Sequence, residues 1–400
     1  MTPKPFKIKI PQAQLDDLQG RLAQTIWPSE VEDAGWKYGP TTAYVKSMVH
    51  RLQTKYDWRE HEAAINDYPQ FTTEIDGQNI HFLHVVSAEA NATPLLLIHS
   101  WPGTIADFLD VIGPLTNPVA HGGKAEDAFD VVIPSLPGFG FSGPTKEAGW
   151  NNGHIAKALI ELMHRLDYEK YGVQGGDVGA IIAPEVARLA PKNVIGVHVN
   201  AATVGFIPLG PVDPKDVAKF SDIEKVRLKR LQRFMAEQGG YNAVQSGRPQ
   251  ALAFGLTDSP AGLLAWNSEL YTNFGDQPEA VAPDKFLTNV MIYWLTGTAA
   301  SANRLYYENA HDPAVYAPKA NSGVPTAVAV FANGEVPIRK YSEQSNTITR
   351  WTEFNEGGHY AVMEVPELWT GDVREFFHNL EGKDGSSPIP KLLRKQGAIL

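Results

Sequence analysis

One stretch, residues 171–191 with the sequence YGVQGGDVGAIIAPEVARLAP, constrains the fold more than any other. The apolar YGV predicts a strand and AIIAPEVARLA predicts a helix, while Gly175, Gly176 and Gly179 surround the turn between them. Side chains at these glycines would collide with the strand or the helix, so they predict a tight, strained turn with Asp177 at its tip. The stretch thus predicts a strand-turn-helix unit that presents an acid.

The acid at this turn has two interpretations. Asp177 can be an ordinary N-cap of the helix, because Asp is common at helix starts. Alternatively, it can be a nucleophile held above the carboxyl edge of a sheet, with a helix N-terminus behind it that favours negative charge. The pentapeptide GGDVG alone favours the N-cap, and the rest of the chain shifts the balance towards the nucleophile.

The pattern of apolar runs indicates an α/β fold with a mostly parallel sheet. The runs PLLLIHS, FDVVIPS and VIGVHVN lack alternation and are short, which is typical of strands that are buried on both faces. FTTEIDGQNIHFLHVV alternates around Asp76 and Gly77 and predicts a hairpin. VPTAVAVFA and TITRWTEF predict later strands, and ELWTGDVREFFHNL predicts a closing helix.

The chain is expected to divide into an interrupted core with two helical additions. Leu15, Leu18, Leu22 and Ile26 recur at spacings of three and four, which predicts a helix near the N-terminus. A helical, aromatic-rich stretch follows the fourth core strand. The expected segments are an N-terminal helical extension with the leading hairpin (1–85), a first core part (86–204), a helical lid (205–300) and a second core part (301–400).

Composition excludes several classes of function. The net charge is -10, and the absence of any block of like charges argues against nucleic-acid partners and a basic membrane-binding face. The chain has no cysteine, which excludes disulfides, thiolate nucleophiles and thiolate metal sites. We expect no signal peptide and no membrane anchor, because no run approaches the roughly 18 apolar residues that span a bilayer. A cytoplasmic location is the default expectation, and the large N-terminal and lid surfaces favour a homodimer.

The sequence HSWPG after the strand PLLLI predicts a loop that faces the turn at Asp177. Hydrolases with a nucleophile on such a turn use two backbone N–H groups as an oxyanion hole, and here these are the N–H groups of Trp101 and Val178. A plain strand-to-helix turn is the alternative. Pro102 is a candidate for a cis peptide bond.

Two further residues fit a catalytic triad. His359 follows two glycines in EGGHYAVMEVPEL, and a histidine suits proton transfer at neutral pH. Glu335, after VPTAVAVFA, is the candidate for the acid that orients it, whereas Glu343 and Glu353 are less well placed. The alternatives are a solvated turn acid for Glu335 and a structural role for His359. The order along the chain is nucleophile, acid and base.

On these motifs the chain resembles the microsomal-type epoxide hydrolases, which place an N-terminal helical segment before an α/β-hydrolase core. The resemblance covers nearly the whole chain. It is carried by the motifs FKIKIPQAQLDDLQGRL, HSWPG, SLPGFGFS, GGDVG, GGYNAVQSGRPQALAFGLTDSPAGLLAW, RLYYEN and EGGHYAVMEVPEL.

The resemblance implies a role for each candidate residue. Asp177 matches the family's nucleophile, His359 its base and Glu335 its charge-relay acid. Tyr241 and Tyr306 match the two lid tyrosines that hold the epoxide oxygen; without the resemblance both would be interpreted as lid packing, and Tyr307 is the nearest rival of Tyr306. The implied reaction converts a small apolar epoxide and water into a vicinal diol through an aspartyl ester, with no metal and no organic cofactor.

Two positions depart from the family pattern. Ser100 stands where the family usually has glycine, and Val178 stands where it usually has tryptophan. Both changes keep the backbone N–H groups of the predicted oxyanion hole. We expect them to change the width of the pocket beside the nucleophile.

The choice of a carboxylate also bears on the reaction. Attack by a carboxylate on an sp3 carbon leaves an ester that water can hydrolyse, whereas a serine alkoxide would leave an unreactive ether. Asp177 therefore argues against esterase and peptidase chemistry. A haloalkane dehalogenase shares the Asp and His logic but holds the halide with N–H groups, and Val178 has no indole to offer. A non-catalytic binding protein on the same fold would not need Asp177, His359 and Glu335 together.

Overall fold

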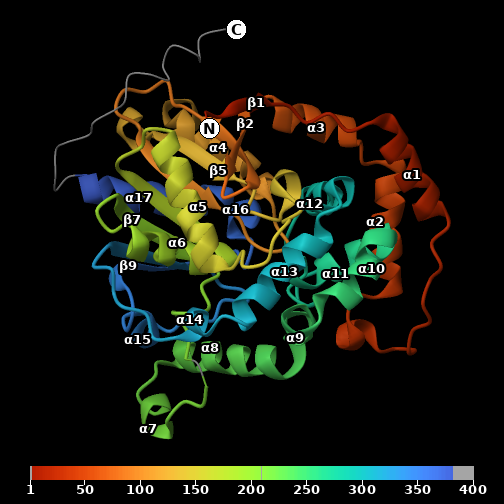
Figure 1. The fold of residues 1–400 in the computed structure, drawn as a ribbon. Coiled ribbons are helices and arrows are strands. Elements are labelled where there is room, and N and C mark those ends of the chain that lie inside the picture. The colour runs from red at the N-terminus through yellow and green to blue at the C-terminus, as the bar shows by residue number, and fades with distance from the viewer. Residues whose placement is uncertain (1, 209, 382–400) are drawn as a thin grey trace.

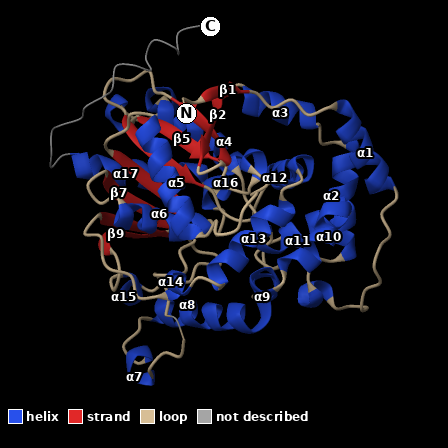
Figure 2. Cartoon of the chain, in the orientation of Figure 1, coloured by secondary structure: helices blue, strands red, loops and turns tan. Residues whose placement is uncertain are grey.

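The computed structural model describes residues 2–208 and 210–381, which form one nine-stranded sheet with helices around it (Figure 1, Figure 2). The strand order is β1-β2-β3-β5-β4-β6-β7-β8-β9. The strands are β1 (Lys4–Phe6), β2 (Gln70–Ile75), β3 (Gln78–Val85), β4 (Thr93–Ile98), β5 (Phe129–Pro134), β6 (Tyr171–Gly176), β7 (Val194–Asn200), β8 (Pro325–Val330) and β9 (Thr347–Glu353).

Strands β5, β4, β6, β7, β8 and β9 are adjacent in this order and run parallel to their neighbours. The edge made by β1, β2 and β3 is antiparallel, and β3 is also antiparallel to β5. The predicted hairpin is confirmed, because β2 and β3 pair in register from Ile75 opposite Gln78. Asp76 and Gly77 form its turn with φ of 50° and 74°, a left-handed conformation that short hairpin turns require. The predicted class, α/β with a mostly parallel sheet, is confirmed.

Helices cover both faces of the sheet, which explains the apolar strands. In β4 the four residues 95–98 are all fully buried, so neither face of this strand meets water. Helices α5 and α6 pack together on one face, and α4 and α17 pack together on the other. The core helices are α4 (Leu109–Thr116), α5 (Asn152–Arg165), α6 (Val178–Leu189), α15 (Arg339–Ser342), α16 (Ala361–Glu364) and α17 (Pro366–Glu381).

The helical region between β7 and β8 forms a lid beyond the carboxyl edge of the sheet, with α9 to α13 grouped beside the core in Figure 1. Proline begins five of its helices, at the first helical position where the missing N–H carries no cost. The lid helices are α7 (Pro214–Val217), α8 (Asp222–Arg233), a π-helical turn (Phe234–Gln238), α9 (Gly240–Gly247), α10 (Pro249–Asp258), α11 (Pro260–Tyr271), α12 (Pro283–Thr296), α13 (Ala299–Ala310) and α14 (Pro313–Tyr316).

The N-terminal segment runs from β1 at the sheet edge around the far side of the lid (Figure 1). Its helices are α1 (Gln12–Ala23), α2 (Thr42–Thr54) and α3 (Trp58–Asn66). The predicted helical face at Leu15, Leu18 and Leu22 lies on α1, but the inclusion of Ile26 was wrong. The helix ends at Ala23, and Ile26 is 94% exposed in the following loop.

The N-terminal helices bind the lid through both apolar and charged contacts. Helix α2 contacts α11 and α12, and α3 contacts α12. Arg51 pairs with both carboxylate oxygens of Asp284 at 2.6 and 2.7 Å, and such forked Arg-carboxylate contacts fix geometry as well as charge. The first 66 residues therefore join the edge of the sheet to the back of the lid.

Candidate active site

The turn at Asp177 joins β6 to α6 at the centre of the sheet and has the predicted strained form. Asp177 adopts φ 55° and ψ -114°, which is unfavourable for a residue with a side chain. A Cβ atom on Gly175 would lie 2.2 Å from the Gly179 carbonyl oxygen, and one on Gly179 would lie 2.4 Å from the Ile98 carbonyl oxygen. Only glycine fits at these two positions, because the atoms they would meet belong to the backbone.

The Asp177 side chain does not cap its helix, so the interpretation of Asp177 as an ordinary N-cap is wrong. Asp177 is the residue before α6, but its carboxylate accepts no hydrogen bond from the first turn. Its Oδ1 instead accepts a hydrogen bond from Trp101 N–H at 3.1 Å. The residue is 8% exposed, and its side chain is turned towards the predicted oxyanion loop.

The HSWPG loop follows β4 and carries Trp101 at its tip. The Trp101-Pro102 peptide bond is cis, as the sequence suggested. The indole Nε1 of Trp101 donates to Asn303 Oδ1 on α13 at 3.1 Å, which ties the loop to the lid. Val178 N–H belongs to the first turn of α6, whose N–H groups have no acceptor within the helix.

His359 lies on the other side of Asp177, on the loop before α16. Its Nε2 is 3.5 Å from Asp177 Oδ2, which is within ion-pair range but too long for a strong hydrogen bond. Burial lowers the pKa of His359. The nearby carboxylate of Asp177, with the charges of Glu335 and Glu364, outweighs this effect of burial and raises the pKa of His359 above its usual value.

Glu335 lies after β8 and is buried at 3% exposure. Its Oε1 accepts from Ala201 N–H at 2.8 Å, while Oε2 has no hydrogen-bond partner. Burial raises the pKa of Glu335 to about 8, and the charge of His359 is the first effect that opposes this rise. Its rivals lie elsewhere, since Glu343 pairs with Arg339 and Glu353 with Arg227. Glu335 lines the same cavity as His359, whereas neither rival does.

Tyr241 on α9 and Tyr306 on α13 come together in the cavity that Asp177 also lines. The ring of Trp101 stacks on Tyr241 at 5.2 Å with an interplanar angle of 4°, and it meets Tyr306 edge-on at 5.4 Å and 78°. The two tyrosine rings lie 6.0 Å apart. Tyr307, the rival of Tyr306, is 39% exposed and stacks on His311 away from this group.

Both lid tyrosines carry a protonated, neutral hydroxyl at ordinary pH. Burial and the charge of Asp177 raise the pKa of Tyr241 far above its usual range, with an opposing effect from Tyr306. Burial, then the charges of Tyr241 and Asp177, raises the pKa of Tyr306 in the same way. Each hydroxyl can therefore donate a proton to an oxygen that gains negative charge near Asp177.

A cavity of about 790 Å³ connects these groups. All five candidate catalytic residues line it: Asp177, Tyr241, Tyr306, Glu335 and His359. Its apolar lining includes Val178, Ile181, Ile207, Phe234, Leu270, Phe274, Leu305, Val315 and Val336. Among the described residues that line it, Val178 is present and Ser100 is absent. Of the two positions expected to change the width of the pocket, only Val178 borders this cavity, whereas Ser100 lies outside its lining.

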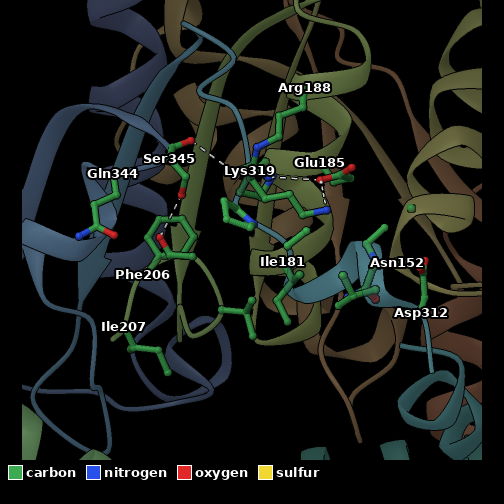
Figure 3. A pocket seen from close by; sticks show the side chains of 18 of the residues that line it. Asn152, Ile181, Glu185, Arg188, Phe206, Ile207, Asp312, Lys319, Gln344 and Ser345 are labelled. Atoms are coloured by element: carbon green, nitrogen blue, oxygen red, sulfur yellow. Dashed lines mark hydrogen bonds and ion pairs between the residues drawn. The ribbon is translucent and has the colours of Figure 1, made fainter. Parts of the chain in front are cut away.

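A second hollow of about 1040 Å³ lies next to the first and shares Asn152, Ile181, Val204, Ile207 and Val315 with it (Figure 3). Arg188 and Lys319 project into this hollow. They lie 3.3 and 3.6 Å from the same Glu185 carboxylate oxygen, so one negative charge offsets part of the positive charge of these two cations. None of the five catalytic candidates lines the second hollow, so the first cavity is the candidate active site.

Three residues close to the site were not assigned a role from the sequence, although His99 belongs to the HSWPG motif. His99 bridges the Ser100 carbonyl oxygen and Leu136 N–H, Asn303 accepts from the Trp101 indole, and Asp107 accepts from Ser100 Oγ. Asn303 stands three residues before the predicted Tyr306, but nothing in its sequence context marks it. Asp107 could have been noticed as an acid within an otherwise apolar run, IADFL.

Two family descriptions match the chain. "Epoxide hydrolase N terminus" matches residues 3–108, and "alpha/beta hydrolase fold" matches residues 93–366. The second therefore covers more than half of the chain, and the first covers the N-terminal segment and the HSWPG loop.

Curated relatives agree with these matches. A putative epoxide hydrolase of Stigmatella aurantiaca is 41% identical over 388 residues, which are 95% of this chain and 86% of that protein. Epoxide hydrolase 1 of Sus scrofa is 32% identical over 405 residues, 94% of this chain and 89% of its own length.

Solved structures have the same arrangement. The juvenile hormone epoxide hydrolase of Bombyx mori superposes with a TM-score of 0.83 at 28% identity and covers 95% of both chains. The Aspergillus niger epoxide hydrolase gives 0.82 at 27% identity and covers 95% of this chain and 97% of its own. Over residues 2–208 and 210–381, no helix of this protein is both long enough and apolar enough to cross a bilayer.

Proposed function

The chain belongs to the microsomal-type epoxide hydrolase family of the α/β-hydrolase superfamily, and we propose that it opens its substrate through a covalent ester on Asp177. It is an enzyme that converts an epoxide and water into a vicinal diol. The observation that carries the proposed mechanism is the environment of one carboxylate. Asp177 Oδ1 is held by Trp101 N–H, while Oδ2 lies on the His359 side.

In the first step, Asp177 Oδ2 attacks one ring carbon of the epoxide and the carbon-oxygen bond of the ring breaks. The electron pair moves to the epoxide oxygen, which takes a proton from Tyr241 or Tyr306. Two buried, protonated hydroxyls over the nucleophile support this role. The product is an ester in which Oδ1 is the carbonyl oxygen and Oδ2 belongs to the bound alcohol.

In the second step, His359 takes a proton from a water molecule that attacks the ester carbonyl carbon. The developing oxyanion is Oδ1, and the N–H groups of Trp101 and Val178 stabilise it. The tetrahedral intermediate collapses, and the alcohol oxygen leaves with the proton from His359. The second proton of the water restores the tyrosine, so the balance is one epoxide and one water to one diol.

Glu335 is proposed to orient His359 and to stabilise its cation. The buried Oε2 without a hydrogen-bond partner and the mutual electrostatic effect of the two side chains support this role. The apolar residues around the catalytic groups favour an apolar body for the substrate, because such residues bind without loss of hydrogen bonds.

The test is to trap the ester and to follow its oxygen. His359→Gln should accumulate an adduct on the peptide that carries Asp177, visible by mass spectrometry with an aryl epoxide such as styrene oxide. In labelled water, the first turnover of the wild type should give diol without label, because its new oxygen comes from Asp177 Oδ2. Full-rate diol formation by Asp177→Ala, or label in the first-turnover diol, would contradict the mechanism.

No observation favours the dehalogenase alternative. A halide needs free N–H donors beside the nucleophile, but the Trp101 indole N–H is already bonded to Asn303 and position 178 is valine. Incubation with haloalkanes should therefore release no halide.

The oligomeric state and the location of the protein remain predictions from the sequence. Light scattering after size-exclusion chromatography tests the homodimer, and fractionation of producing cells tests the cytoplasmic location.

A further inference from the structure

The turn that carries Trp101 N–H is built around a buried carboxylate. Asp107 is 3% exposed, and its Oδ2 accepts from Ser100 Oγ at 3.1 Å. A Cβ atom on Gly103 would lie 2.0 Å from the same Oδ2 and 2.4 Å from Ser100 Oγ. The backbone from Ser100 to Gly103 thus closes directly onto the Asp107 carboxylate.

The C-terminal end of this turn, at Gly103 and Thr104, is fixed by the lid. Tyr293 on α12 donates its hydroxyl to the Gly103 carbonyl oxygen at 3.0 Å. Thr104 Oγ1 donates to Asn289 Oδ1, also on α12, at 2.6 Å. The N-terminal end of the turn, at Ser100, has two other contacts: His99 bonds the Ser100 carbonyl oxygen, and the Asp107 carboxylate accepts from the Ser100 hydroxyl.

The contacts of Ser100 affect the oxyanion hole because Ser100 and Trp101 share one peptide group. The carbonyl of Ser100 and the N–H of Trp101 belong to the same planar peptide, and that N–H donates to Asp177 Oδ1. Any rotation of the Ser100–Trp101 peptide plane turns this N–H away from Asp177. Burial raises the pKa of Asp107 to about 7, and the Ser100 hydrogen bond is the first effect that opposes the rise, which supports a direct coupling of the two side chains.

We propose that Asp107 is a positioning residue which, through Ser100, holds Trp101 N–H in line with Asp177 Oδ1 and thereby favours ester hydrolysis over ester formation. The inference rests on the proposed covalent mechanism. Ester hydrolysis places negative charge on Oδ1, so it needs a well-aligned N–H. Ester formation removes charge from the carboxylate, so the same hydrogen bond does not accelerate it. Ser100, where the family usually has glycine, then serves this alignment rather than the width of the pocket.

The test separates the two steps by rapid-quench mass spectrometry of the Asp177 peptide with styrene oxide. In Asp107→Asn the ester should decay about tenfold more slowly, while it forms at a rate within about twofold of the wild type or slightly faster. Ser100→Ala should shift the ratio of the two rates in the same direction by a smaller factor. The double variant should be no slower than Asp107→Asn, because the two side chains act as one unit.

Asp130→Asn is the matched control. Asp130 is another buried carboxylate, and it accepts from Ser87 N–H at 2.8 Å and Tyr168 hydroxyl at 3.3 Å. This variant should leave the ratio of the two rates unchanged even if it lowers the melting temperature. Equal slowing of both steps in Asp107→Asn, or no change in ester decay, overturns the inference.

Two further results keep the inference testable. If Asp107→Asn does not fold, Ser100→Ala decides by the same ratio, because it removes a single hydroxyl. If no ester is found even in His359→Gln, the covalent mechanism fails first and the positioning role fails with it. An ester that forms normally but decays at the wild-type rate in both variants refutes the positioning role alone.

Discussion

The core half and the lid half of the active site hold their reactive groups by different physical means. In the core, Asp177 is held by a strained backbone, two obligatory glycines and a hydrogen bond from Trp101 N–H. In the lid, Tyr241 and Tyr306 are held by ring packing around the Trp101 indole. Trp101 is therefore shared, since its backbone serves one half and its side chain the other.

This difference explains which parts of the site are visible in the sequence. A strained turn tolerates few residues, so the core half leaves a short motif around Asp177. Ring packing can be achieved by many aromatic patterns, so Tyr241 and Tyr306 look like ordinary lid residues. The predictions below test whether the two halves fail in the different ways that their construction implies.

The largest effect is expected in the lid half. Tyr241→Phe with Tyr306→Phe should slow ester formation by about 10³-fold or more, because both proton donors are lost while the rings still pack. Each single variant should lose less, since one hydroxyl remains. Tyr307→Phe, at an exposed tyrosine, is the control and should behave as the wild type in the same single-turnover assay. A double variant within tenfold of the wild type would show that the proton comes from elsewhere.

In the core half, we expect a loss of stability, because a side chain at a glycine of the turn collides with backbone atoms. Gly179→Ala would place its Cβ 2.4 Å from the Ile98 carbonyl oxygen. We therefore expect the free energy of unfolding to fall by about 3 kcal/mol and the activity to be lost. Gly371→Ala in α17 is the matched control, because nothing lies within 4 Å of its Cβ position. Urea denaturation measures both. Equal stability of Gly179→Ala and the wild type would mean that the turn is not strained as described.

A smaller effect is expected from the wall of the cavity. Val178→Trp restores the residue that the family usually has and fills space beside the nucleophile. We expect kcat/KM to fall about tenfold for a bulky aryl epoxide, the order of a steric mismatch in an apolar pocket, and to change little for a small aliphatic one. The ratio of the two values is the measurement. An unchanged ratio would show that Val178 does not set the substrate range.

The smallest change is electrostatic. The charge of Asp177 helps to raise the pKa of His359, and this contribution disappears when the carboxylate becomes a neutral ester. Asp177→Asn imitates that loss, so the pKa of His359 should be lower than in the wild type when it is followed by NMR of the imidazole. Because His359 must be neutral to act as a base, ester hydrolysis should then persist to a lower pH than the free-enzyme pKa suggests. An equal or higher pKa in the variant would contradict this coupling.

The fold was largely predictable because its strands and turns are specified locally. The hairpin at Asp76 and Gly77 was correctly predicted from its alternation and turn residues, and the buried strands were correctly predicted from runs such as PLLLI. The prediction that Ile26 lies on helix α1 was wrong because spacing alone does not tell where a helix ends. The helix stops at Ala23, and no residue in the sequence QTIWP marks that stop as strongly as a glycine would.

The site was predictable only where backbone geometry demands particular residues. Asp177 and its glycines formed a motif, but its N-cap interpretation could be rejected only once the carboxylate was seen to bond Trp101 rather than its own helix. The contact of Ser100 with Asp107 could not be foreseen, because a buried acid looks in sequence like any other acid. The roles of the catalytic residues themselves remain predictions for experiment.

The N-terminal segment also has a consequence for the order of synthesis. Helix α2 buries Val45, Val49 and Leu52, and its partners are α1, which is made before it, and α11 and α12, which the ribosome makes about 200 residues later. At roughly 5–20 residues per second, the part of this apolar face that meets the lid stays uncovered for about 10 to 40 seconds. The part of the chain that is made first is thus among the last to reach its final contacts, and a chain released before residue 296 would leave this face open to aggregation.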